Sequence, residues 1–293
     1  MSVQFYPSKN NNRLNRMSFT PECMTGQIKR AMLNPHYPVT TAKGTKKIFD
    51  SGAFQELDMK DRLTPKQALA RQLSMNDLVR FRSEDYDNHA EAFITYDMLV
   101  GVDEALVNGA RVKQRGNEES ARPAVAATLE SAVYYASQRQ RIPGAIAFAA
   151  QGATPDQYVN ECVIPMFDVM EPSDWFAFGG FCIIGMQPSL KPLFMETVAR
   201  VLPLLVKKGI TRAHVLGVCV ADMVKYAADQ GRRHGVVMST DSSSIEINSI
   251  MGKVWNDGRW MKVYEKEQKY VDYWPTPLAH ENIKRFSEWS ASL

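Results

Sequence analysis

Short apolar runs alternate with longer amphipathic stretches along the chain. Each run holds roughly four to eight residues and ends in a polar or glycine-rich turn, as buried strands of a parallel sheet do. This pattern predicts strands over Lys47–Asp50, Leu99–Asp103, Ala145–Gln151, Trp175–Gly179, Ala213–Val218 and Gly235–Thr240.

The stretches between these runs predict helices. Thr64 is an N-cap and Pro65 opens the first turn of one of them. The expected helices are Pro65–Ser74, Glu118–Arg139, Pro155–Phe167, Lys191–Lys208 and Ala221–Arg232.

Repeated strand–helix units predict a parallel α/β fold. At 293 residues and without a dinucleotide GxGxxG motif, a (β/α)8 TIM barrel is the first choice, and a doubly wound open sheet is the alternative. The remaining barrel strands are expected in less clear segments near the N-terminus. The polar residues 1–20 predict a flexible N-terminal arm, and residues 21–293 predict a single barrel domain.

Composition restricts the class of protein only broadly. The chain is 45% hydrophobic and 23% charged, as soluble globular proteins are, and its net charge of +3 fits a polyanionic partner without requiring one. The four cysteines form no CxxC pair, which favours a reduced cytoplasmic protein without a zinc knuckle. No apolar run predicts a signal peptide or a membrane span.

In a β/α barrel, the chemistry lies at the carboxyl ends of the strands. The predicted strands end in polar or glycine residues that would converge on one rim. A single aspartate at such a place is commonly only a turn residue or a helix cap. Their shared position at the same end of each strand nevertheless predicts one functional site, made of Asp50, Asp103, Gln151, Gly179, Gly180, Gly217 and Asp241.

The same positions carry a family resemblance. The segment Phe49-Asp50-Ser51-Gly52-Ala53-Phe54-Gln55 resembles the Asp-Ser-Gly-Gly-(Phe/Tyr)-Gln signature of the tRNA-guanine transglycosylase superfamily. Further segments resemble motifs of that superfamily in the same order, over roughly residues 20–250. They are Val100–Glu104, Ala149–Gly152, Trp175–Phe181, His214–Val218 and Gly235–Ser242.

The resemblance implies base exchange at a nucleoside with retained stereochemistry, which two carboxylates can perform. It implies Asp241 as the nucleophile and Asp50 as the general acid/base, and we expect neither a cofactor nor a metal. It implies a base-binding set of Ser51, Phe54, Asp103, Gln151, Gly179, Gly180, Phe181 and Leu216. From residue type alone, Phe54 and Leu216 fit a core position as well, and His214 fits a structural role.

Two departures from the family pattern narrow the expectation. No cysteine follows Cys219, so the zinc-binding Cys-x-Cys-x-x-Cys…His module is not expected. The run Ser242–Ile247 has no arginine, unlike the Pro-Thr-Arg run of tRNA-acting bacterial members. Both departures favour the branch that resembles the DNA guanine transglycosylases of phages and bacteria. These enzymes insert a 7-deazaguanine, such as 7-cyano-7-deazaguanine, into DNA.

The expected partners are therefore DNA and a 7-deazaguanine base, in the cytoplasm, or in the host cytoplasm if a phage encodes the protein. A tRNA-guanine transglycosylase of the queuosine or archaeosine type and a non-catalytic partner subunit are the alternatives, and a homodimer remains open. The target guanine has to leave its stack to reach the rim.

Cations expected to hold the nucleic-acid backbone are Lys46, Lys47, Arg111, Lys113, Arg115, Arg139, Arg141, Arg232 and Arg233. Trp255 and Trp260, beside Lys253 and Arg259, either stack on unpaired bases or form the core of a β-hairpin around Asn256-Asp257-Gly258.

Overall fold

The computed structural model describes the chain over most of its length. For the segments 102–107 and 110–115 the description is of the backbone alone. The described residues are 2–8, 30–34, 41–53, 62–87, 90–100, 102–107, 110–182, 187–242, 244–263 and 277–293.

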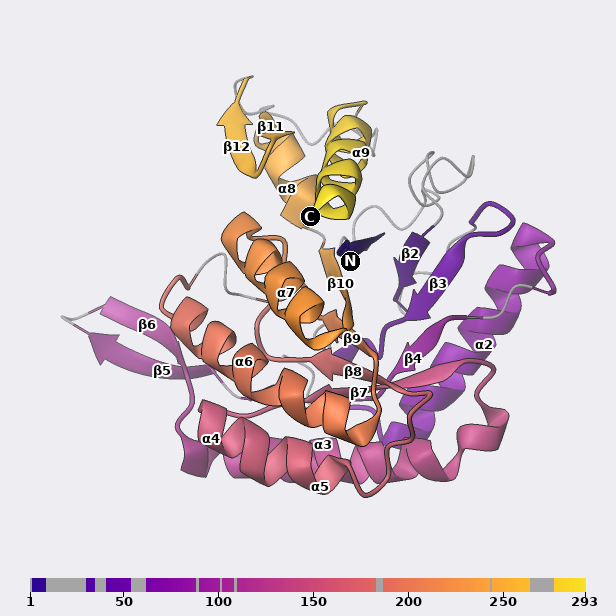
Figure 1. The fold of residues 1–293 in the computed structure, drawn as a ribbon, viewed down its shortest axis with the longest axis vertical. Helices are drawn as coiled ribbons and strands as arrows, with labels where there is room; N and C mark the ends of the chain where they lie inside the picture. The colour runs from indigo at the N-terminus through magenta and orange to yellow at the C-terminus, as the bar shows by residue number, and fades with distance from the viewer. Residues whose placement is uncertain are drawn as a thin grey trace.

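An eight-stranded parallel sheet forms the centre of the molecule (Figure 1). A parallel bridge between Ser8 and Met32 joins its two edge strands, so the sheet is nearly closed into a barrel. Around this barrel the strands follow their order in the sequence. They are β1 (Gln4–Pro7), β2 (Arg30–Leu33), β3 (Lys46–Phe49), β4 (Ala92–Ile94), β7 (Ala145–Ala150), β8 (Trp175–Phe178), β9 (Arg212–Val215) and β10 (Val237–Ser242).

Helices flank the outside of the barrel (Figure 1). The first of them begins with a capping box, in which Thr64 accepts from the Gln67 amide and the Gln67 side chain accepts from the Thr64 amide. The flanking helices are α2 (Pro65–Ser83), α3 (Glu118–Ser137), α4 (Pro155–Gln157), α5 (Ile164–Met166), α6 (Leu190–Lys208) and α7 (Ala221–His234). A π-helical turn, Tyr158–Val163, joins α4 to α5. The fold is therefore α/β, as the alternating pattern predicts.

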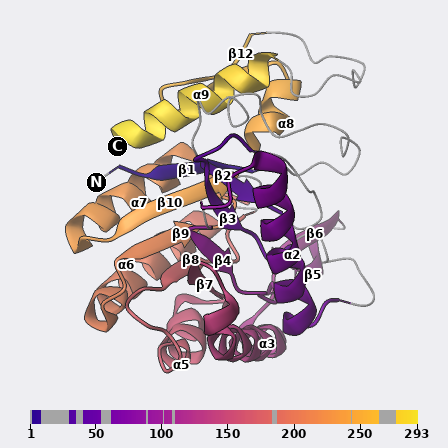
Figure 2. The same ribbon diagram turned by 90° about the vertical axis from the view of Figure 1, so that its right-hand side faces the viewer.

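Two further pieces lie outside the barrel. After β4 the chain forms the antiparallel hairpin β5 (Val102–Val107) and β6 (Ala110–Arg115), which projects from the body in Figure 1. The C-terminal part comprises α8 (Ser244–Ile250), the hairpin β11 (Lys253–Asn256) and β12 (Arg259–Lys262), and α9 (Pro277–Ser292). Figure 2 shows this part stacked against the side of the barrel that carries β1 and β10.

Two expectations from the sequence are wrong. Leu99–Asp103 is not a barrel strand, because β4 at Ala92–Ile94 takes that place and Asp103 lies in the projecting β5. Residues 1–20 are not all a loose arm, because β1 at Gln4–Pro7 pairs with β10. β1 is a four-residue strand within a polar segment, and β4 is a three-residue strand close to a competing apolar run, so the sequence pattern does not single them out.

Apolar side chains fill both sides of the sheet. Inside the barrel, small and large residues combine, among them Ala149, Ala177 and Ile48. A larger core packs between the sheet and the surrounding helices, and it includes Phe49 and Phe148. Because neighbouring strand residues point to opposite faces, Ile48 lies inside while Phe49 lies outside. Among the described helices, none combines the length and the apolar character that crossing a membrane requires.

Candidate active site at the carboxyl ends of the strands

Polar residues gather at the carboxyl ends of the barrel strands. Asp50 follows β3, Asp97 lies three residues after β4, Gln151 follows β7 and Asp241 is the fifth residue of β10. Parallel strands deliver these residues to one rim, so their chemistry can act on one ligand.

Asp241 is held by donors on one of its two oxygens. Its Oδ1 accepts from the Gly217 amide at 2.7 Å and lies 3.2 Å from His214 Nε2. His214 is fully buried, and its Nδ1 lies 2.8 Å from the Ser239 hydroxyl. In the tautomer protonated at Nε2, His214 donates to Asp241 and accepts from Ser239, so every one of these groups is satisfied.

The other oxygen of Asp241 remains available. Within the described residues, no hydrogen bond reaches Oδ2 of Asp241. The side chain keeps 9% of its surface exposed. The carboxylate is thus fixed through Oδ1 and can present Oδ2 to a ligand at the rim.

Asp50 lies in a different environment. Burial, followed by the nearby charges of Asp241 and Asp97, raises the pKa of Asp50 to about 7. Hydrogen bonds from the Ser51 and Gly52 amides oppose this rise without cancelling it, and the Asn34 side chain also donates to Asp50, at 2.9 Å. At neutral pH this carboxyl group is therefore divided between its acid and base forms, as a group that both gives and takes a proton requires.

Asp97 and Gln151 form a second polar pair at the rim. The Gln151 amide nitrogen donates to Asp97 Oδ2, and the Ser51 hydroxyl lies 3.5 Å from Asp97 Oδ1. Burial raises the pKa of Asp97, while the Gln151 bond and the charge of Arg62 lower it. The amide oxygen of Gln151 is buried and has no hydrogen-bond partner among the described residues. A buried acceptor of this kind is costly unless a ligand donor satisfies it.

Gly179 makes room for this pair. A Cβ at Gly179 would lie 2.3 Å from the Gln151 amide nitrogen and 2.7 Å from the Ala150 carbonyl. The Gly179 amide is also bonded, at 3.1 Å, to the hydroxyl of Tyr158 in the π-helical turn. Only glycine at this position lets the Gln151 side chain lie across the end of β8.

The other predicted base-binding residues take several positions. Ser51 and Gly180 lie at the rim, and Gly180 has a φ of +81°. The ring of Phe181 is fully buried against Tyr158 and Phe194, so only its backbone can face a ligand.

Leu216 is half-buried and packs against the cluster inside the barrel. Phe54 lies outside the described residues, and the side chain of Asp103 is not described.

Several predicted backbone-binding cations lie far from this rim. Lys46 and Lys47 begin β3, at the end opposite Asp50, and Arg232 and Arg233 lie in the last turn of α7. The helices run antiparallel to the strands they follow, so the end of α7 also belongs to the opposite face. These residues do not reach a nucleic acid bound at the carboxyl rim.

Lys47 contradicts the expectation most clearly. Its side chain is fully buried and pairs with Asp85 at 3.3 Å. Arg139 is likewise engaged by Asp174 and Glu171. Arg141 bonds Gln138 at 2.8 Å.

The cations of the β5–β6 hairpin remain candidates for binding the nucleic-acid backbone. Arg111, Lys113 and Arg115 occupy alternate positions of β6, in the hairpin that leaves the barrel after β4. Alternate residues of a strand belong to one face.

Sequence reasoning missed Asp97 and Asn34, and it gave His214 no part in the site. Asp97 ends the run Ala92-Phe93-Ile94-Thr95-Tyr96, whose aromatic and β-branched character was a usable signal for a strand with an acid behind it. The sequence holds no such signal for the contact of Asn34 with Asp50 or for that of His214 with Asp241. Both contacts depend on which strands become neighbours in the sheet.

In comparisons with known proteins, no family model and no curated protein matches the chain. The geometry of the rim is therefore the basis for a functional assignment.

Proposed function

We propose that the chain is a (β/α)8-barrel base-exchange enzyme that replaces guanine in DNA with a 7-deazaguanine through a covalent aspartyl-glycosyl intermediate. The observation that carries this proposal is the contrast between two carboxylates on one rim. Asp241 has one oxygen fixed by donors and one available, whereas the pKa of Asp50 is raised to about 7. Pairs of carboxylates with such different environments divide nucleophile and acid/base roles.

In the first step, Oδ2 of Asp241 attacks C1′ of the target nucleotide while the C1′–N9 bond breaks. The electron pair of that bond leaves with guanine, which takes a proton from Asp50. The product is a sugar bonded to Asp241 and a neutral free base. The Gly217 amide and His214 keep the attacking carboxylate oriented during this displacement.

In the second step, the incoming base gives its N9 proton to Asp50, and N9 attacks C1′ from the face that guanine left. The bond from C1′ to Asp241 breaks, and the carboxylate is restored. Two inversions give net retention, as in a retaining glycosidase. Asp50 ends the cycle in the protonation state in which it began.

Asp97 and Gln151 supply the recognition of the base, and Asp97 takes the place that Asp103 has in the base-binding set expected from the sequence. Guanine presents an N1–H and an exocyclic amine on one edge, and a 7-deazaguanine keeps the same edge. Acceptors for these donors are available at Asp97 and at the unpaired amide oxygen of Gln151. One pocket can therefore hold the leaving base and the incoming base in turn.

The test is an exchange assay with radiolabelled guanine, in which double-stranded DNA, single-stranded DNA and tRNA are offered separately. We expect label in DNA, and no label with Asp241→Asn, whose amide keeps an acceptor for the Gly217 amide but cannot form the glycosyl ester. Asp168→Asn, on the exposed surface, is the matched control. Label in tRNA instead of DNA would assign the same chemistry to tRNA, and label in neither would favour a partner subunit.

The covalent intermediate has its own readout. Without an incoming base, wild-type protein and guanine-containing DNA should form an adduct that survives denaturation. Asp241→Asn should form none. An adduct with the asparagine variant would place the nucleophile elsewhere.

A further inference from the structure

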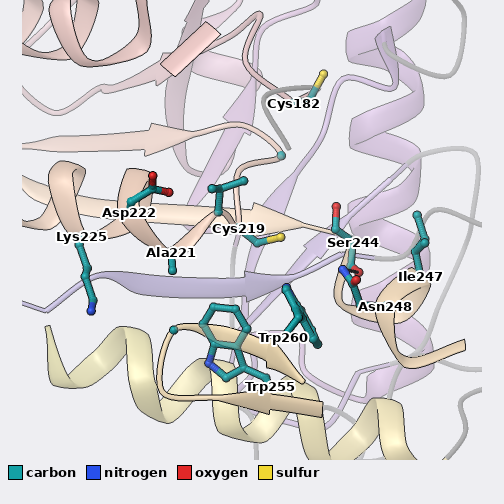
Figure 3. A pocket seen from close by; sticks show the side chains of 13 residues that line it. Cys182, Cys219, Ala221, Asp222, Lys225, Ser244, Ile247, Asn248, Trp255 and Trp260 are labelled. Atoms are coloured by element: carbon teal, nitrogen blue, oxygen red, sulfur yellow. Dashed lines mark hydrogen bonds between the residues drawn. The ribbon is translucent and has the colours of Figure 1, made fainter. Parts of the chain in front are cut away.

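A cavity of about 640 Å³ lies beside the candidate active site. Its walls come from the loop after β9, the start of α7, the short helix α8 and the β11–β12 hairpin. Figure 3 shows Trp255 and Trp260 on one side of this cavity and Cys219, Ala221 and Asp222 on the other. A cavity of this size can hold a nucleotide.

The two tryptophans have different roles. Trp255 is 1% exposed and packs against Phe286 and Trp289, with ring centroids 4.8 Å and 5.0 Å away. It belongs to the core that joins the hairpin to α9. Trp260 is opposite Trp255 in the hairpin, is only partly buried, and meets it edge to face at 5.0 Å. Trp260 is therefore the tryptophan that can stack on a ligand ring.

The cavity is adjacent to the nucleophile candidate. Gly217 lines the cavity, and its amide donates to Asp241 at 2.7 Å. Successive nucleotides of one strand advance only about 3.4 Å along a B-form axis. When the sugar of the target nucleotide sits at Asp241, a nucleotide next to it must lie within reach of this cavity.

The charges around the cavity suit a polyanion. Asp222 is matched by Lys191 at 2.6 Å, so its charge is largely compensated. Lys225, one turn further along α7, is exposed, and the structure records no ion pair for it among the described residues. Lys262 on β12 is exposed as well, and it lies two residues after Trp260, on the same face of the strand. A phosphate at the mouth of the cavity would meet positive charge.

We infer that this cavity binds the nucleotide next to the target guanine in the DNA strand, with its base stacked on Trp260 and its phosphate held by Lys225. This inference rests on the proposed function for the position of the target. Stacking on an aromatic side chain reads no particular base edge, so the cavity holds the strand without selecting its sequence.

The test measures binding of a fluorescein-labelled single-stranded DNA heptamer with a central guanine, by anisotropy. An Asp241→Asn background keeps the binding reversible. Two further heptamers lack the base immediately 5′ or immediately 3′ of the guanine. We expect one of them to bind roughly tenfold more weakly than the intact strand.

Trp260→Ala should weaken the intact heptamer by a similar factor, and the missing base should then cost nothing more. Trp260→Phe should retain most of the binding, because it keeps an aromatic ring at this position. That result would attribute the loss in Trp260→Ala to the missing ring and not to a disturbed fold. Phe81→Ala, an exposed aromatic on α2, is the matched control and should change nothing. Lys225→Ala should lower the slope of log affinity against log salt by about 0.7, and Lys207→Ala should not.

Equal losses from the missing base in the Trp260→Ala and parent proteins would overturn the inference, as would no loss in either. Guanine exchange by the wild-type protein would then still support the proposed function. If binding depends on the neighbouring base but no exchange occurs with any substrate, the cavity assignment stands and the proposed function fails.

Discussion

Asp50→Asn is expected to make the protein more stable above neutral pH while it abolishes base exchange. The folded structure raises the pKa of Asp50 from 3.8 to about 7, chiefly through burial. A rise of about three pH units corresponds to about 4 kcal/mol of unfavourable free energy for the charged form. Asparagine has nearly the same shape and carries no charge, so it removes this cost.

The direction of the pH dependence follows from the proton balance. Between about pH 4 and pH 7 the folded protein holds a proton on Asp50 that the unfolded chain has released. Ionisation of Asp50 therefore does not destabilise the fold at low pH. The free energy of unfolding falls as the pH rises through this window, and the loss is complete above about pH 7. Asparagine has no such dependence. Between about pH 5.5 and pH 8 the advantage of Asp50→Asn should grow by about 2 kcal/mol.

The assay is urea unfolding of wild-type protein, Asp50→Asn and the surface control Asp168→Asn at both pH values. The variant loses one acceptor oxygen for the Asn34 and Ser51 donors, which costs about 1 kcal/mol at every pH. Because this cost does not vary with pH, the test is how the difference in unfolding free energy between Asp50→Asn and wild type changes with pH. A difference that stays constant from pH 5.5 to pH 8 would refute the raised pKa and with it the acid/base role of Asp50.

Three further predictions concern the neighbouring groups. Gly179→Ala should destabilise the fold by about 1–3 kcal/mol in urea unfolding and reduce exchange, because the new Cβ displaces Gln151; unchanged exchange would mean that this side chain does not read the base. His214→Ala should lower kcat by about 10- to 100-fold with little change in KM, because Asp241 loses a donor; a change confined to KM would contradict this positioning role. Asp85→Ala should cost about 3–5 kcal/mol in urea unfolding, because it removes the carboxylate that pairs with the buried Lys47 ammonium, and a loss under about 1 kcal/mol would show that the ammonium is compensated otherwise.

The sequence predicts those parts of the barrel in which a strand is a long apolar run. The strands near Ala145, Trp175 and Val237 are found at nearly their observed bounds for this reason. β4 has only three residues, and the nearby segment Leu99–Asp103 has a similar apolar pattern but is not a strand of the barrel. A short barrel strand can be assigned only from the strands with which it pairs, and a single sequence does not show this pairing.

For the site, topology made several positions predictable. A residue that follows a buried parallel strand lies at the carboxyl rim, so Asp50, Gln151, Gly179 and Asp241 could be named from strand ends. The cations were harder, because charge does not tell which end of a strand a residue occupies. Lys47 shows the consequence, since it precedes Asp50 by three residues and yet is buried toward the opposite face.

The distribution of charge between the two ends of the barrel also bears on the partner-subunit alternative. At the amino end, acids are compensated, as Glu91 is by Arg212 at 3.5 Å and by Lys46 at 3.3 Å. At the carboxyl rim, burial raises the pKa of both Asp50 and Asp97, and the charges of Asp241 and Asp97 raise that of Asp50 further. Such a cluster reduces the stability of the fold above neutral pH. A barrel that served only as a scaffold would gain by replacing one of these acids with an amide, so their joint presence favours an enzyme.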